Sequence, residues 1–250
     1  MIVLKLGGSV ITDKDRAETL DGEALDRAAD AVAEALADPE GSLAEGLVVV
    51  HGGGSFGHHN ASEHGVSTTA GTRDPTAVQE IHGAMTTLNA FVRSRLLERD
   101  VPAVPVHPFS AGHRDADGEL HLPTGQIATL LEEGFVPVLH GDVIAHAGTG
   151  ATIVSGDELV AELARTLGAD RVGLCSTVPG VLDADDRVVE RIDSYETVAD
   201  VLGESESTDV TGGMAAKVRA LLELEANASI FGLAALEDFL AGETAGTTIE

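Results

Sequence analysis

Apolar segments that run into glycine clusters are the feature that most constrains how this chain can fold. Residues 2–6 lead into Gly7-Gly8, and the run Leu47-Val48-Val49-Val50 leads through His51 into Gly52-Gly53-Gly54. Short continuous apolar runs predict strands that are buried on both faces, as in parallel sheets. Glycine lets the backbone turn sharply and lets its N–H groups approach a ligand. The pattern therefore predicts ligand-binding loops at the carboxyl edge of a mainly parallel sheet.

Strand and helix periodicity alternate along the rest of the chain. We expect helices at 22–37, 75–99, 123–133, 156–167 and 212–226, a hairpin at 111–121 that turns at Asp117-Gly118, and strands at 101–106, 135–139, 171–175, 229–232 and 247–249. This alternation predicts an α/β fold with a mainly parallel sheet covered by helices on both faces. The chain has 250 residues and 43% hydrophobic content, so we expect one domain over residues 1–250.

The sequence gives no indication of membrane insertion or secretion. No apolar run approaches the roughly 18 residues that a membrane-spanning helix needs. The N-terminus lacks the basic region and the small-residue cleavage site of a signal peptide. The single cysteine, Cys175, excludes an internal disulfide and fits a cytoplasmic protein.

The charge balance is strongly acidic. Asp and Glu number 42 against 15 Lys and Arg, which gives a formal net charge of −27 at pH 7. Such a surface repels nucleic acids and anionic membranes. Acidic excess also occurs in disordered chains, but those are poor in hydrophobic residues. We therefore expect a folded protein adapted to high salt, where ions screen the self-repulsion.

Lysine is scarce, and its three positions are informative. Lys5, Lys14 and Lys217 all lie in or near glycine-rich segments, whereas the other basic residues are arginines. We expect these lysines to be kept where an ammonium group has a function. In Lys5-Leu6-Gly7-Gly8-Ser9, backbone N–H groups and the lysine charge could bind a phosphate, although a Gly-Gly pair alone often marks only a turn.

A triple glycine precedes the segment Ser55-Phe56-Gly57-His58-His59. Three glycines lose more conformational entropy than a plain turn requires, and a glycine run before a helix suits an anion-binding site. His58 and His59 could hydrogen-bond a phosphate, bind a metal or cap the helix. Metal binding is disfavoured because no partner ligand has a suitable spacing. We therefore expect one histidine to contact a phosphate.

Two further glycine segments open predicted helices. Ser155-Gly156-Asp157-Glu158 could be only a helix cap with a first-turn acid, or Gly156 could admit a ligand while Asp157 anchors lysine ammonium groups. The segment from Asp209 to Lys217 puts a Gly-Gly pair at a helix start and the lysine about one turn inside it. A cation there opposes the helix dipole unless an anion is bound, so Lys217 favours a phosphate site. P-loop and protein-kinase motifs are absent from the sequence.

In their order and spacing, the four glycine segments resemble the amino acid kinase superfamily over essentially the whole chain. Within it, the stretch from Lys5 to Lys14, the Gly-Gly-Gly-Ser-Phe-Gly-His run at 52–58 and Val154-Ser155-Gly156-Asp157 are similar to the archaeal isopentenyl phosphate kinases. The resemblance implies an open αβα sandwich and a homodimer. It also implies an acceptor-binding N-terminal half, about residues 1–150, and a nucleotide-binding C-terminal half, about residues 151–250.

The resemblance further implies a role for each matching residue. Mg²⁺ would be held mainly by the ATP phosphates, so no protein metal ligand is expected. Catalysis would depend on the lysines, on an aspartate that orients them and on a histidine that holds the acceptor phosphate: Lys5, Lys14, Lys217, Asp157 and His58. ATP would also contact Gly7, Gly8, Ser9, Gly53, Gly180 and Gly213. The acceptor would be lined by Gly52, Gly57 and Gly156, and its isoprenoid tail by Val78, Ile81, Val143 and Ile153.

The sequence departs from the family at one turn. After the 171–175 strand the family usually has Thr-Asp-Val-Asp-Gly, whereas this chain has Ser176-Thr177-Val178-Pro179-Gly180. Both acids are missing. Gly180 and the downstream Asp183 and Asp185 remain candidates for nucleotide contacts.

ATP-dependent phosphorylation of isopentenyl phosphate is the reaction that the resemblance implies. One alternative is a sister kinase, such as one acting on fosfomycin, that differs in pocket shape. Another is a glutamate or acetylglutamate kinase, which should carry basic or amide groups for an α-carboxylate; we identify none in the sequence. From a different class, the chain could be a nucleotide-binding sensor or storage domain, but the retention of all three lysines argues against this.

We predict that the protein needs high salt for stability. The net charge of −27 should destabilise the folded state in dilute buffer, because a Debye length of about 10 Å at 0.1 M salt leaves much of the repulsion unscreened. Urea unfolding in about 0.1 M and about 2 M KCl measures the difference. Equal unfolding midpoints in the two buffers would contradict the high-salt hypothesis.

Overall fold

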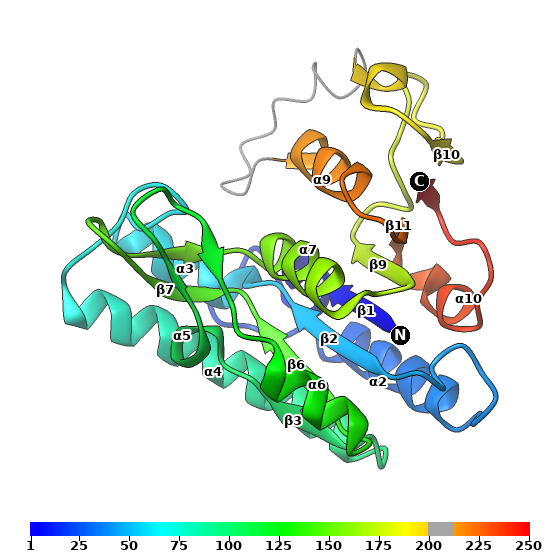
Figure 1. Cartoon of the computed structure of the whole chain (residues 1–250), viewed down its shortest axis with the longest axis horizontal. Coiled ribbons are helices and arrows are strands. Elements are labelled where there is room, and N and C mark those ends of the chain that lie inside the picture. The colour runs from blue at the N-terminus through cyan, green and yellow to red at the C-terminus, as the bar shows by residue number, and fades with distance from the viewer. Residues whose placement is uncertain (200–212) are drawn as a thin grey trace.

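The computed structural model describes residues 1–199 and 213–250, which form two sheets and the helices around them (Figure 1). The larger sheet consists of β1 (Ile2–Leu6), β2 (Leu47–His51), β3 (Ala103–Pro105), β6 (Val136–His140), β9 (Arg171–Ser176), β10 (Arg191–Ile192), β11 (Asn227–Gly232) and β12 (Thr247–Ile249). Their order is β10-β12-β11-β9-β1-β2-β6-β3. Within the described residues, only the β11–β12 pair of this sheet is antiparallel, so the expected mainly parallel sheet is confirmed.

Helices cover both faces of this sheet, as Figure 1 shows for α2 and α7. One face carries α2 (Gly22–Leu36), α4 (Pro75–Leu97) and α10 (Leu236–Leu240), and the other carries α6 (Gly125–Glu132), α7 (Gly156–Leu167) and α9 (Gly213–Leu222). The short α1 (Gly8–Ile11), α3 (Gly54–Glu63) and α5 (Pro108–Ala111) follow strands β1, β2 and β3. The layers are those of an open αβα sandwich.

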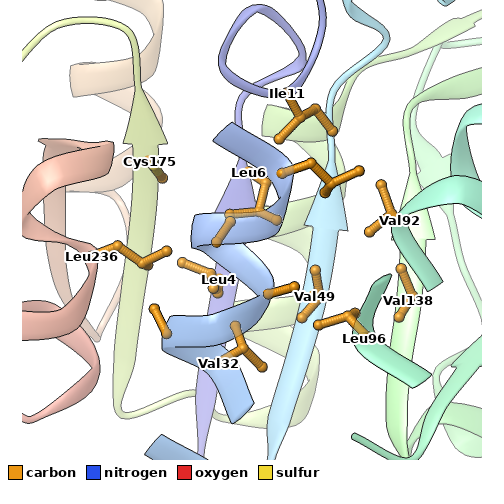
Figure 2. Packing of buried hydrophobic residues seen from close by; sticks show 14 of the residues in the cluster. Leu4, Leu6, Ile11, Val32, Val49, Val92, Leu96, Val138, Cys175 and Leu236 are labelled. Carbon is orange, nitrogen blue, oxygen red and sulfur yellow. The ribbon is translucent and has the colours of Figure 1, made fainter. Parts of the chain in front are cut away.

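Strand β1 shows how the sequence specifies these layers. Successive side chains of a strand point to opposite faces. Leu4 and Leu6 pack in the core between the sheet and α2, α4 and α10 (Figure 2), whereas Val3 packs in the core beneath α7. Lys5 follows Val3 on the α7 side and reaches the start of that helix. The apolar run therefore fills both cores and leaves one cation at its carboxyl end.

A smaller sheet lies beside the first and consists of β4 (His113–Arg114), β5 (Leu120–His121), β7 (Asp142–His146) and β8 (Gly150–Val154), in the order β5-β4-β7-β8. The β4–β5 hairpin confirms the one expected at 111–121, and Gly118 takes a φ of +86° in its turn. The sequence analysis did not predict the β7–β8 hairpin. Gly148 lies in its turn and Gly150 begins β8, and both have a positive φ. These two closely spaced glycines are the sequence signal that could have identified the hairpin.

The other predicted elements match the observed ones to within a few residues. Of the strand predicted at 101–106, only Ala103–Pro105 forms a strand, β3. The helix predicted at 212–226 corresponds to α9, which ends at Leu222. Among the described residues, no helix is long and apolar enough to cross a membrane.

Candidate active site

A cavity of about 470 Å³ lies at the carboxyl ends of β1, β2 and β9 and beside the first turn of α7. Parallel α/β sheets characteristically bind ligands in this position, because the strand ends and helix starts meet there. Residues from both halves of the chain line it. The predicted site residues among them are Lys5, Gly7, Gly8, Ser9, Gly52, Gly53, Gly57, His58, Ile81, Ile153, Gly156, Asp157 and Lys217.

Lys5 and Asp157 form an ion pair in this cavity. Lys5 is only 9% exposed, and its Nζ lies 2.8 Å from Asp157 Oδ1. A side chain at Gly156 would put its Cβ 3.1 Å from Lys5 Cε, so glycine leaves room for the lysine to pass. An ammonium group has three N–H donors, so the pair leaves Lys5 with donors for an anion. The structure thus brings together the lysine and the aspartate that the sequence analysis associated.

The start of α7 is a capping box that also lines the cavity. Ser155 Oγ accepts a hydrogen bond from the backbone N–H of Glu158 at 3.2 Å, and Glu158 Oε2 accepts one from the N–H of Ser155 at 2.8 Å. This reciprocal pair fixes the first helical turn. The sequence left open whether the segment was a helix cap or a ligand-binding turn. In the structure it caps α7, and it also exposes Gly156 and Asp157 to the cavity.

The two N-terminal glycine loops touch each other at the cavity floor. A Cβ at Gly8 would lie 2.1 Å from the backbone nitrogen of Gly54, and a Cβ at Gly52 would lie 2.6 Å from that of Gly8. Thr12 joins the loops, because its Oγ1 donates to the carbonyl oxygen of Gly8 at 2.7 Å and accepts from the N–H of Ser55 at 3.0 Å. Close backbone contact therefore requires glycine at these positions, independently of any ligand.

The adjacent histidines His58 and His59 belong to helix α3, and only one of them lines the cavity. His58 lines the cavity. His59 does not line it; its side chain is 44% exposed, and its Nε2 lies 3.7 Å from Glu63 Oε1 one turn later. Successive residues of a helix point about 100° apart, which explains the difference.

An apolar wall closes the side of the cavity next to α3 and α4. Ile81 of α4 and Ile153 of β8 contribute to it, as do Ala61, Val66 and Met85. Val143, the partner of Ile153 in the β7–β8 pair, is fully buried and does not line the cavity. Val78 instead lines a separate groove between α4 and residues of α5, β7 and β8. Ile81 and Ile153 thus line the cavity, whereas Val78 and Val143, the other two expected tail-binding residues, do not.

Three further predicted site residues lie outside the cavity. Lys14 is exposed in the turn after α1. Gly180 is required for packing, because a Cβ there would lie 2.7 Å from Thr247 Oγ1. Gly213 has a φ of +65° at the first described residue of α9. The part of the fourth glycine segment from Asp209 to residue 212 lies outside the described residues.

A cluster of four histidines beneath the cavity was not anticipated. His51 and His140 end the neighbouring strands β2 and β6, and their rings stack with centroids 5.5 Å apart. His107 Nδ1 lies 2.9 Å from His140 Nε2. His82 Nδ1 lies 2.9 Å from Oδ2 of Asp142, a buried carboxylate that lines the cavity. The signal in the sequence was two buried strands that both end in His-Gly.

Hydrogen bonds define the tautomers of the two innermost rings. His51 Nδ1 and His140 Nδ1 donate to the carbonyl oxygens of Gly52 and Gly141, so Nε2 of each ring is the acceptor. Nε2 of His51 accepts from the amide of Asn89 at 3.2 Å. Burial lowers the pKa of His51 to about 4 and that of His140 to about 3, whereas the hydrogen bond to Asp142 raises the pKa of His82. The inner pair is therefore neutral at pH 7.

The cavity combines phosphate-binding groups with an apolar wall. Lys5, Lys217 and the glycine-rich loops line one part, and the aliphatic side chains of α4 and β8 line another. Cys175 also lines it, but burial raises the pKa of its thiol to about 12, so it is not an activated nucleophile. The arrangement can neutralise phosphate groups next to an apolar chain, and it contains no thiolate for covalent catalysis.

Comparison with known proteins identifies the family. The profile of the Amino acid kinase family matches residues 1–230. The chain belongs to the amino acid kinase family. The isopentenyl phosphate kinase of Haloferax volcanii is 62% identical over 251 residues, covering 100% of this chain and 98% of that protein. The enzyme of the same name from Methanothermobacter thermautotrophicus is 34% identical over 238 residues, covering 90% and 86%.

Solved structures agree with this assignment. A structure described as "X-ray structures of isopentenyl phosphate kinase" superposes on this amino acid kinase with a TM-score of 0.84 and 30% sequence identity. It covers 100% of this chain, and this chain covers 99% of it. The amino acid kinase fold inferred from the four glycine segments is therefore confirmed over the whole chain.

We predict that the buried histidines make the kinase less stable in mild acid. Below about pH 6.5 histidines in the unfolded chain bind protons, while His51 and His140 stay neutral in the folded state. The unfolded state then binds more protons than the folded state. As the pH is lowered, the free energy of unfolding therefore decreases by up to about 1.4 kcal/mol per pH unit for each of these two histidines. His82, whose pKa is raised, contributes stability that is complete below about pH 6.5 and lost as pH rises through its folded pKa.

Urea unfolding at pH 7, 6 and 5, at fixed salt, measures this slope. His140→Gln should make the slope shallower, because it removes one buried titrating group. His59→Gln is the matched control, since that histidine is exposed, and should leave the slope unchanged. Equal slopes for wild type and His140→Gln would contradict the prediction.

Proposed function

We propose that this kinase transfers the γ-phosphoryl group of ATP to isopentenyl phosphate, giving ADP and isopentenyl diphosphate. The observation that carries the proposal is the cavity, in which cationic and glycine-rich phosphate-binding elements adjoin an apolar wall. Its relatives of high identity bear the name of this activity, which supports the same substrate here. We expect the enzyme to act in the cytoplasm, where ATP is available.

The nucleotide would occupy the side of the cavity formed by the C-terminal half. Ser176 at the end of β9, Thr177 after it and Lys217 of α9 line that side. The acceptor would occupy the side formed by α3, α4 and β8, in keeping with the division near residue 150. Mg²⁺ would be held mainly by the phosphates of ATP, which suits an ion that keeps several waters. It would neutralise charge on the transferring group.

Catalysis in this proposal is positioning and charge neutralisation. An oxygen of the acceptor phosphate attacks the γ-phosphorus in line as the bond to the ADP oxygen breaks. The acceptor oxygen is already anionic, so no strong base is needed. Lys5, held by Asp157, and Lys217 would stabilise the charge on the transferring group. His58 would donate an N–H to the acceptor phosphate and hold it as the two anions approach.

The alternatives differ in what the acceptor side must provide. An amino-acid kinase needs cationic or amide groups to bind an α-carboxylate. On the acceptor side of this cavity, the wall consists of apolar side chains such as Ile81, Met85 and Ile153. A fosfomycin-type kinase would share His58 and differ in the shape of the wall. The isoprenoid tail is the acceptor group that an apolar wall favours most.

We also propose that the enzyme is a homodimer, as the family resemblance implies. Helix α4 exposes two large hydrophobic side chains, Phe91 at 43% and Leu97 at 49%. Exposed aromatic and aliphatic side chains on one helix are typical of subunit interfaces. Light scattering in molar KCl measures the mass directly.

A coupled assay of ADP release tests the reaction. Purified protein in molar KCl should turn over ATP with isopentenyl phosphate, and ³¹P NMR should detect the diphosphate product. Acetylglutamate and fosfomycin serve as competing acceptors. Faster turnover with either one would replace the proposed acceptor, and ATP binding without turnover on any of them would favour the non-catalytic alternative.

We predict that Lys217→Ala folds but loses about two to three orders of magnitude in turnover, the scale of removing one preorganised donor to the transition state. Arg219→Ala is the matched control, because Arg219 is on the same helix but stacks on the ring of Tyr195, 4.0 Å from its centroid. It should retain turnover. A folded Lys217→Ala variant within about threefold of wild type would contradict the proposed role.

We predict that His58→Ala strongly depresses turnover with isopentenyl phosphate, while His59→Ala does not. Only His58 lines the cavity among these two adjacent histidines. His58→Gln keeps an N–H donor of similar reach and should retain part of the activity, because donation matters more than proton transfer. Steady-state kinetics of the three variants test this. If His59→Ala lost most of its turnover and His58→Ala kept most of it, the proposed role of His58 would be wrong.

A further inference from the structure

A buried arginine lies next to the start of α7 without lining the cavity. Arg114 belongs to β4 in the smaller sheet, and its side chain is 7% exposed. Burying a guanidinium costs free energy that carboxylate and carbonyl partners must offset; the two Nη groups of Arg114 have such partners, whereas its buried Nε has none. The partners of Arg114 therefore indicate which parts of the protein it fixes.

Arg114 contacts both flanks of the turn formed by residues 154–157. Its Nη2 lies 2.5 Å from Glu158 Oε1, after the turn, and 3.3 Å from the carbonyl oxygen of Ile153, before it. Its Nη1 donates to the carbonyl oxygen of Gly118 at 3.2 Å. One planar, rigid group thus joins the β4–β5 hairpin, the end of β8 and the first turn of α7.

Glu158 divides its carboxylate between two partners. Oε1 accepts from Arg114, while Oε2 accepts from the backbone N–H of Ser155 in the capping box. The glutamate side chain is 36% exposed, so it would sample several rotamers without a partner. The charge-assisted bond to Arg114 restricts it to the rotamer that holds the cap.

The capped turn in turn determines where the catalytic lysine can lie. Asp157 is its last residue, and Asp157 Oδ1 holds Lys5 Nζ at 2.8 Å. Lys5 also packs closely against Gly156 of the same turn, where an added Cβ would lie 3.1 Å from Lys5 Cε. A shift of the turn therefore moves the lysine ammonium relative to the phosphates. Misplacement of a reacting group by about 1 Å can cost about 100-fold in rate.

We propose that Arg114 is a positioning residue for phosphoryl transfer, acting through Glu158 and Asp157 on Lys5. The inference rests on the kinase activity proposed above. The competing explanation is that Arg114 only attaches the β4–β5 hairpin to the rest of the protein. In that case its loss lowers the unfolding temperature but not the turnover of the folded enzyme.

Kinetics of three variants distinguish these explanations. Arg114→Met keeps the length of the side chain and removes the guanidinium. Glu158→Gln keeps the size of the other partner and removes its charge. The third variant carries both substitutions. Arg165→Met is the matched control, because Arg165 pairs with Glu162 on the same helix α7 but is 68% exposed. Each variant is assayed in molar KCl at a temperature at which circular dichroism shows it folded.

We expect Arg114→Met to lower kcat about 10- to 100-fold, the scale of a misplaced catalytic group. The KM for isopentenyl phosphate should change less than about threefold, because Arg114 is outside the cavity. Glu158→Gln should lower kcat about tenfold. In the double variant the losses should not multiply, since both changes release the same turn. Arg165→Met should match wild type.

A folded Arg114→Met enzyme with wild-type kcat overturns the inference, as do losses that multiply in the double variant. If Arg114→Met does not fold, Glu158→Gln decides, and wild-type kcat in that variant overturns the inference too. Failure of the proposed function is a different result: the wild-type protein and the Arg165→Met control would then not turn over isopentenyl phosphate at all.

Discussion

The ion pair between Lys5 and Asp157 is the contact on which the rest of the site depends. It joins the carboxyl end of β1 to the first turn of α7, two segments that are 152 positions apart in the sequence. Lys5 is nine-tenths buried, so the aspartate must offset the cost of removing an ammonium from water. The ion pair uses only part of the donor capacity of the ammonium group, so Lys5 retains N–H donors for a phosphate. The pair therefore offsets the cost of burying the cation and leaves it able to bind an anion.

Sterics explain the glycines around this pair as fully as ligand binding does. Gly8, Gly52 and Gly54 allow two loops to touch where any Cβ would collide with backbone, and Gly156 clears the path of the lysine. The same close packing places glycines of both loops along one cavity. A glycine motif in this fold thus has two causes, and a side chain at Gly8 or Gly52 would push the two loops apart as well as narrow the cavity.

The sequence predicted the layers, the sheet and the residues that converge at the strand ends, because those follow from local periodicity and from glycine chemistry. It did not reveal the features that depend on contacts between distant segments. Val143 and Ile153 are both apolar and lie opposite each other, yet only Ile153 reaches the cavity. Gly180 resembles a ligand-binding glycine but makes room for Thr247. The contacts between His107 and His140 and between Arg114 and Glu158 each join residues more than 30 positions apart, which no local pattern reveals.

The burial of Lys5 also helps to explain how a protein with a large negative net charge could bind an anion such as ATP. A chain of net charge −27 repels ATP at long range, and molar salt removes this repulsion, since the Debye length falls to about 3 Å at 1 M. The same salt weakens the attraction between exposed cations and phosphates. A lysine that is 9% exposed and bonded at 2.8 Å is screened much less than a surface lysine. Placing the cation below the surface should therefore preserve short-range phosphate binding at the high salt that we predict the acidic surface needs. This prediction offers a reason why one of so few lysines is buried in the cavity.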